Sequence, residues 1–367
     1  MSLFTPVQGI VGGSLIGGSA GVLLILNGDI MGASGILSNA LVNPIQAIQN
    51  PKNHWRYVYL ASFALSVNVF VNYLAPKDFM SDERSLDSDV PIPSAIAYIL
   101  GGFFVGLGTK IGNGCTTGHG ICGISRFSPR NLVATCTFTG CSMATTYFLS
   151  PLRQWGSMTE FLRTTGIPAM SSVGSGLFLA AAVFAALATP AFSAKNRSAT
   201  LDQAQGENED RKTLGATLSG AMFAAGLAIS GMAKASKVHD FLCISGFSKG
   251  SFDPTLVAVM GCGILASWLS YQFVDGFSMT SKTPLTCPLM GDKFSVPTNT
   301  AIDSQLLLGT SLFGLGWGIT GICPGPAIFA AASGNVYATL LWLPGFVVGS
   351  MAGANVKEAM NSKKKAA

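Results

Sequence analysis

The stretch Gly112-Asn113-Gly114-Cys115-Thr116-Thr117-Gly118-His119 ends a long apolar segment, and a second cysteine motif repeats its pattern. Gly106 opens a Gly-Leu-Gly triplet nine residues before Cys115, and Gly314 opens the same triplet nine residues before Cys323. The two copies are 208 residues apart. Such a repeat indicates a duplicated membrane protein in which two equivalent breaks mark the functional region.

The composition of the chain is typical of a membrane protein. Charged residues make up 11% of its 367 residues and hydrophobic residues 49%, and the mean hydropathy is +0.46. An ordinary soluble surface needs more charge than this. The basic residues behind the net charge of +5 are scattered among loops, which argues against nucleic-acid binding. The eight cysteines lie mostly in apolar segments and do not resemble a disulfide scaffold.

Nine apolar stretches approach the ~20 residues that a spanning helix needs. They are residues 7–27, 55–75, 93–110, 129–150, 168–194, 213–233, 254–276, 302–320 and 335–355. The sequence therefore predicts an all-α polytopic membrane protein with about nine transmembrane helices, interrupted by short re-entrant Gly/Cys breaks.

The polar loops divide this chain into parts. We expect a first membrane repeat plus a connecting span over 1–194, a polar cytoplasmic linker over 195–212, a second membrane repeat over 213–356, and a basic cytoplasmic tail over 357–367. A shift of five spans between the repeats makes them inverted in the membrane. Of the 22 Lys and Arg residues, 15 fall on the side reached after the first span, which predicts an outside N-terminus and a cytoplasmic C-terminus.

The chemistry of the two breaks favours an anion. Glycines permit unusual backbone dihedrals, and a helix that restarts after them presents free N–H groups that attract anions. Thiols add soft, weak donors, which suit an anion that contains sulfur. The candidate residues of a substrate path are Cys115, Cys323, Gly114, Thr116, Thr117, Gly118, His119, Pro324 and Gly325.

Other residues leave two interpretations open. His119 either relays a proton and orients the site or merely caps a turn, and Lys110 either attracts an anion or snorkels to the interface. Asp29 marks a functional break or only a helix end. The remaining cysteines are interpreted as small buried hydrophobes or left undecided. A zinc site is not expected, because Cys115, His119 and Cys122 lack a fourth ligand and a C-x-x-C pair; no metal, cofactor or ATP-binding P-loop is predicted.

At these residues the chain resembles the YeeE/YedE family, the sulphur transport domain. The stretches that carry the resemblance are Gly112 to Gly120, Gly231 to Met260 and Gly314 to Ala327. The later stretches are similar to a companion subfamily that bacteria encode as a separate short chain, so the sequence resembles both half-proteins fused.

This resemblance implies thiosulfate uptake through an hourglass-shaped helical protein whose constriction carries the cysteines, here Cys115 and Cys323. It also implies a soluble, rhodanese-like sulfur carrier as a partner. The transporter branch of the family has a further cysteine near the end of the first span. The corresponding stretch, Asn27 to Gly32, has none, and Cys243 is the candidate replacement.

Two functional hypotheses follow. The first is a non-enzymatic transporter of thiosulfate or a related small sulfur-containing anion in the lipid bilayer. The alternative is a membrane sulfurtransferase or thiol-redox protein in which a cysteine carries a persulfide.

Overall fold

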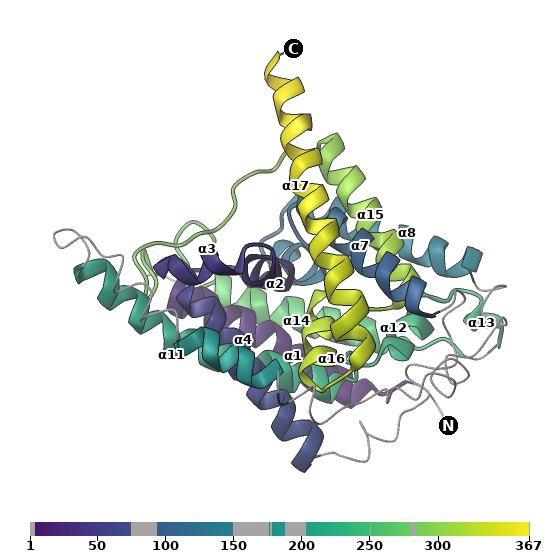
Figure 1. Cartoon of the computed structure of the whole chain (residues 1–367), viewed down its shortest axis with the longest axis horizontal. Coiled ribbons are helices and arrows are strands. Elements are labelled where there is room, and N and C mark those ends of the chain that lie inside the picture. Colours follow the sequence, from purple (N-terminus) through teal and green to yellow (C-terminus); the bar gives the residue numbers. More distant parts are fainter. Residues whose placement is uncertain are drawn as a thin grey trace.

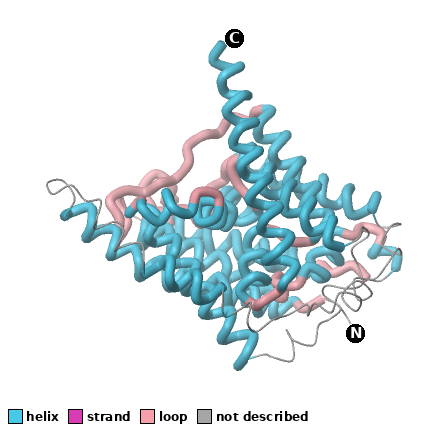
Figure 2. Tube along the Cα trace, in the orientation of Figure 1, coloured by secondary structure: helices cyan, strands magenta, loops and turns pink. Residues whose placement is uncertain are grey.

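The computed structural model describes residues 4–74, 94–149, 176, 178–187, 203–249, 251–279 and 284–366. Within these residues the protein is helical and has no strand (Figure 2). The first half contains α1 (Pro6–Val22) with η1 (Leu23–Asn27), α2 (Ala33–Leu41), α3 (Pro44–Gln49), η2 (Pro51–Asn53), α4 (His54–Val69) with η3 (Phe70–Leu74), α7 (Ser94–Gly112), η4 (Thr116–Gly123) and α8 (Pro129–Leu149). The second contains α11 (Gln203–Ser230), α12 (Ala235–Leu242), α13 (Gly246–Lys249), α14 (Thr255–Tyr271), α15 (Ser304–Thr320), α16 (Pro324–Ala332), η6 (Ala338–Trp342) and α17 (Leu343–Ala366).

Seven of the described helices are long and apolar enough to cross a membrane, so the prediction of an all-α polytopic membrane protein is confirmed. One of the nine predicted spans differs in length. The stretch 254–276 forms the 17-residue α14, which at 1.5 Å per residue is about 25 Å long and shorter than a ~30 Å hydrocarbon layer. The stretch 168–194 lies mostly outside the described residues, which show only the short apolar helix Phe178–Leu187.

Two helix boundaries also differ from the predicted domains. Helix α11 begins at Gln203, inside the stretch predicted to be a linker, and α17 continues to Ala366, through the predicted tail. Charged residues such as Lys, Glu and Arg are good helix formers, so polarity alone does not mark a helix end.

The long helices form two packed rows, which Figure 1 shows one above the other. The lower row has the order α4, α11, α1, α14, and the upper row has the order α17, α7, α15, α8. The short segments α2, α12 and η4 contact both rows, and α16 packs on α4 and α11 of the lower row and on α2. The chain breaks on either side of the cysteines are thus enclosed by helices from both halves.

Equivalent helices of the two halves run antiparallel. Near the start of α7, Gly101 packs against Thr320 at the end of α15, and at the end of α7, Gly112 packs against Gly309. The row orders agree with this relation. In the lower row α1 packs on α14, as its equivalent α11 packs on α4. In the upper row α7 packs on α17, as its equivalent α15 packs on α8. An approximate two-fold axis perpendicular to the helices therefore relates the halves.

The first helices of the halves obey the same relation. Gly12, near the start of α1, lies against Ser230 at the end of α11, while Gly215 in α11 lies against Asn27. Antiparallel equivalent helices are what inverted repeats require.

Glycines allow α7 and α15 to touch backbone to backbone. A Cβ added to Gly108 would lie 2.3 Å from the Phe313 nitrogen, and one added to Gly309 would lie 2.2 Å from the Gly112 nitrogen. Small residues at helix interfaces are a common packing device in membranes.

The loop before α15 closes the end of η1. The N–H groups of Leu289 and Met290 donate to the carbonyls of Ile25 and Leu26 at 3.0 and 2.8 Å. These carbonyls would otherwise lack partners at a helix end.

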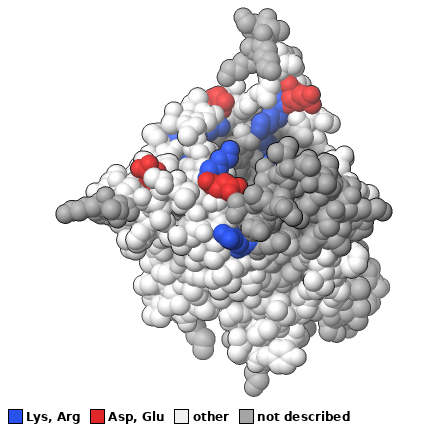
Figure 3. Space-filling model, turned by 90° about the vertical axis from the view of Figure 1, so that its left-hand side faces the viewer, with Lys and Arg blue, Asp and Glu red and all other residues white. Residues whose placement is uncertain are grey.

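On one face of the molecule the charged side chains gather near one end. In Figure 3 the Lys, Arg, Asp and Glu side chains lie in the upper part of the face, and a broad surface below them is uncharged. An uncharged surface of this kind suits contact with lipid, and the protein is an integral, multi-pass membrane protein.

Candidate functional site

The two cysteines occupy the same structural position in their halves. Cys115 is the N-cap of η4 and Cys323 is the N-cap of α16, both with extended backbone. Two residues earlier, Asn113 and Gly321 have positive φ values of 63° and 68°. A left-handed residue ends an α-helix, so each long helix stops and a short one restarts at the cysteine.

The two breaks meet through a side-chain contact. The Thr116 hydroxyl donates to the Cys323 sulfur at 3.4 Å, while the Cys115 sulfur lies 3.2 Å from the Thr117 hydroxyl. Cys115 is 1% exposed and Cys323 is 9% exposed. The structure therefore brings the two predicted cysteines into one buried cluster with the two threonines.

Several short helices begin at this cluster. The N–H of Ala33, the first residue of α2, donates to the Thr117 hydroxyl at 3.2 Å. Gly321 packs so closely on the start of α12 that an added Cβ would lie 2.7 Å from the Ala235 carbonyl oxygen. Together with η4 and α16, four helix N-termini surround the cysteines, and their dipoles favour negative charge.

His119 connects the first break to α8. Its Nδ1 lies 2.6 Å from Asn131 Oδ1 and its Nε2 lies 3.2 Å from the Gly112 carbonyl oxygen. A Cβ on Gly114 would lie 2.6 Å from Nε2, which explains a glycine at that position. His119 thus holds the turn that carries Cys115.

The remaining predicted path residues lie around this cluster. Pro324 and Gly325 form the first turn of α16 and are buried, and a Cβ on Gly325 would lie 3.0 Å from the Phe223 ring. Gly118 has open space beside it, since nothing lies within 4 Å of the position of an added Cβ.

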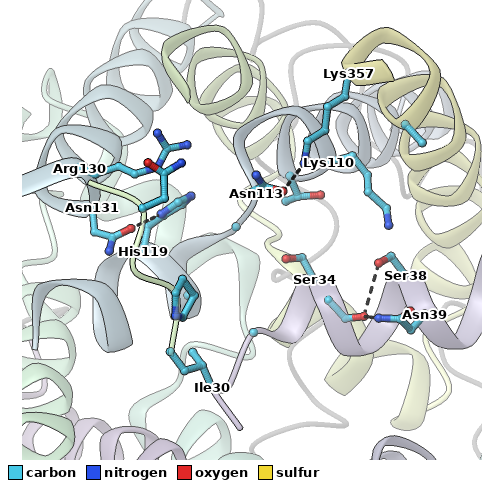
Figure 4. A pocket seen from close by; sticks show the side chains of 18 of the residues that line it. Ile30, Ser34, Ser38, Asn39, Lys110, Asn113, His119, Arg130, Asn131 and Lys357 are labelled. Carbon is cyan, nitrogen blue, oxygen red and sulfur yellow. Dashed lines mark hydrogen bonds between the residues drawn. The ribbon is translucent and has the colours of Figure 1, made fainter. Parts of the chain in front are cut away.

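The turn that carries Cys115 separates two cavities. A cavity of about 960 Å³ reaches Gly114, Gly118 and His119 (Figure 4). A smaller one of about 360 Å³, largely apolar, reaches Thr116 and Cys323. The cysteine turn therefore lies between two cavities, with Gly118 and His119 lining one and Thr116 lining the other.

A third cavity, of about 650 Å³, lies beside the start of α12. It is lined by Lys234, Lys237 and the buried Asp253, and Lys237 pairs with Asp253 at 2.7 Å. Lysines thus line cavities in both halves of the molecule.

The accessory candidates have different surroundings. Lys110 lines the cavity of about 960 Å³, whereas Asp29 and Cys243 line none of these three cavities. Burial raises the pKa of Asp29, and the nearby cations Lys212 and Arg56 oppose that rise. Cys243 ends α12 and lies 3.2 Å from the Ser245 hydroxyl.

The sequence did not single out two residues that complete the cluster. Cys122 is buried on η4 and donates to the Met31 carbonyl at 3.5 Å, and Asn131 is the partner of His119. The seven-residue spacing from Cys115 to Cys122 was the available signal for the second thiol. No group of three His, Cys, Asp or Glu side chains that could hold a metal occurs in the part of the chain that the structure describes.

Comparison with known proteins gives two results. The family described as a family of unknown function (DUF6691) matches residues 212–366. A probable transporter of Xylella fastidiosa strain Temecula1 is 39% identical over 142 residues, which are 38% of this chain and 92% of that protein. A probable transporter of strain 9a5c is 33% identical over 119 residues, which are 32% of this chain and 74% of that protein.

Proposed function

Because this chain belongs to the family of the probable transporters of Xylella fastidiosa, we propose that it moves a small sulfur-containing anion, such as thiosulfate, across a membrane. The path passes between the two cavities at the Cys115 and Cys323 breaks. Its cytoplasmic end is the face that carries the C-terminus.

The observation that carries this proposal is the meeting of two equivalent helix N-caps, each a cysteine, at the Thr116–Cys323 contact. Backbone that leaves the helix inside a membrane protein is tolerated where it is buried or lines a polar path. Here it is buried, carries hydroxyl and thiol donors, and has open space on either side. A transporter needs such a barrier between two cavities, and a purely structural helix break does not.

The cargo is a soft anion with the thiols in their neutral form. A thiolate facing a monoanion at 4 Å would cost about 4 kcal/mol at an effective dielectric constant near 20. Neutral thiols instead donate weakly to sulfur and oxygen acceptors. The resemblance of both breaks to the YeeE/YedE family supports thiosulfate as that anion, with a soluble rhodanese-like protein as its acceptor.

The chain combines two units that relatives carry separately. Since 142 residues are 92% of one relative, that protein is less than half as long as this chain. The antiparallel pairing of α7 with α15 supplies, within one polypeptide, the interface that two half-length chains would form.

Uptake of labelled thiosulfate by cells that lack other sulfate and thiosulfate importers tests the function. We expect the wild-type chain to restore uptake, and we expect Cys115→Ala and Cys323→Ala to lower it at least tenfold. Cys136→Ala is the matched control, because Cys136 is exposed on α8. Undiminished uptake by both variants would remove the thiols from the mechanism.

Mass spectrometry separates the alternative. A stable adduct with the mass of one sulfur atom on Cys115 or Cys323, found without transmembrane flux, would favour a sulfurtransferase over a transporter.

A further inference from the structure

The cavity of about 960 Å³ is a vestibule between the cysteine turn and the face that carries the C-terminus. Its inner end is formed by Gly114, Gly118 and His119. Its walls carry four basic side chains from α7, α8, α17 and the turn before α8, and one acidic side chain. The basic residues are Lys110, Arg126, Arg130 and Lys357, and the acidic residue is Glu358.

The two arginines are occupied by the loop before α15. Arg130 pairs with Asp303 at 3.2 Å and donates to the Ala301 carbonyl, and Arg126 donates to the Pro297 carbonyl. These contacts fasten the loop to α8 and use at least part of each guanidinium. The arginines therefore serve mainly to hold the vestibule wall.

The two lysines keep unused donors. Lys357 gives one hydrogen bond to Asn113 Oδ1, which leaves two of its three N–H groups. Lys110 has no hydrogen bond or ion pair with any residue that the structure describes, and in Figure 4 its side chain points into the space above Ser38. Serine and asparagine side chains of α2 face the same space.

We propose that this vestibule binds a divalent oxyanion between the ammonium groups of Lys110 and Lys357. Two ammonium groups attract a dianion more strongly than a monoanion, and the surrounding hydroxyl and amide groups complete the hydrogen bonds of its oxygen atoms. The proposal rests on the proposed function, because it places the substrate class, sulfate-like dianions, at one end of the same path.

The site is one-sided. The position equivalent to Lys110 at the offset of 208 residues is Gly318, which has no side chain to offer. The repeats therefore share the cysteine breaks but not the vestibule, and only one end of the path retains a dianion.

A simpler role for these lysines is to set the orientation of the chain in the membrane, as basic residues near span ends do. That role needs charge on one side of the membrane but no ammonium group inside a cavity. Lys52, exposed on η2, lies on the same side of the membrane as Lys110 and Lys357 in the predicted topology. It lies outside the vestibule, so it provides a matched control.

Equilibrium binding of labelled sulfate and labelled thiosulfate to the full-length protein in lipid nanodiscs tests the site. We expect Lys110→Gln and Lys357→Gln each to weaken binding about tenfold, a change of about 1.4 kcal/mol. Lys110→Arg and Lys52→Gln should bind like the wild type, and nitrate should compete more weakly than unlabelled sulfate. An unaltered elution profile on gel filtration identifies folded variants.

Three outcomes would overturn the vestibule site: no binding by the wild type, binding by both Gln variants as tight as that of the wild type, or competition by nitrate as strong as that by unlabelled sulfate. Failure of the proposed transport function would give a different result from failure of the vestibule site. In that case the nanodisc protein binds the dianions at Lys110 and Lys357 but cells take up no thiosulfate.

Discussion

The Thr116 hydroxyl of the first break donates a hydrogen bond to the Cys323 sulfur of the second at 3.4 Å. These residues are 207 positions apart, and each belongs to the start of a short helix. The two inverted halves are therefore coupled at the point where the chain leaves its long helices. Separation of the two breaks would break this hydrogen bond.

Replacing Thr116 with Val should lower thiosulfate uptake about fivefold, because it removes a donor to Cys323 while keeping the shape of the side chain. A hydrogen bond of this kind contributes about 1 kcal/mol. Thr116→Ser keeps the hydroxyl and should transport like the wild type. Equal loss in both variants would assign the effect to packing instead.

Gly108→Ala should destabilise the protein, because its Cβ would lie 2.3 Å from the Phe313 nitrogen and force α7 away from α15. Gly140→Ala is the control, since nothing lies within 4 Å of its added Cβ and alanine favours a helix over glycine by about 1 kcal/mol. Thermal unfolding in detergent should show a lower midpoint for Gly108→Ala and an equal or higher one for Gly140→Ala. The reverse order would contradict the packing of α7 on α15.

Asn131→Leu should loosen the cysteine turn. The substitution leaves the buried His119 Nδ1 without its partner, and an unsatisfied buried polar group costs about 1–3 kcal/mol. We expect a lower unfolding midpoint and faster alkylation of Cys115 by maleimide.

Asn131→Asp is the informative comparison, because it keeps an oxygen that accepts from a protonated Nδ1. Recovery of slow alkylation in this variant, increasing as the pH falls, would identify His119 as the group that holds the turn. Identical alkylation rates in all three proteins would exclude that role.

The Arg130–Asp303 pair should make the vestibule wall sensitive to acid. Partial burial raises the pKa of Asp303, but the hydrogen bond from the Leu306 N–H and the charge of Arg130 outweigh this and hold it below its usual value. A carboxylate with a lowered pKa stabilises the fold fully above its unfolded pKa of about 3.9 and loses that contribution as the pH falls through the folded value.

Thermal unfolding measured from neutral pH down to about pH 3 checks this expectation. Asp303→Asn keeps a helix N-cap but has no charge. Its unfolding midpoint should lie below that of the wild type at neutral pH, and this difference should shrink below about pH 4. A deficit that is constant with pH would show that Arg130 does not act through the Asp303 charge.

Much of the fold follows from local sequence. The apolar lengths predicted the long helices to within a few residues, because a spanning helix must satisfy its own backbone hydrogen bonds over a fixed thickness. The prediction was weakest at the start of α11 and the end of α17, and it also missed the end of α14. Polar residues at the start of α11 continue the helix, and α14 is shorter than the apolar stretch that contains it.

The sequence by itself determined the duplication, the equivalence of Cys115 and Cys323, and the position of both breaks, because residue spacing and the absence of helix-forming side chains are local properties. Only the tertiary structure decided which groups surround the cysteines. Thr116 with Cys323, His119 with Asn131, and Lys110 with Lys357 are brought together by the packing of two antiparallel halves. No local pattern encodes such contacts, since they depend on how closely glycine-lined helices from distant parts of the chain approach one another.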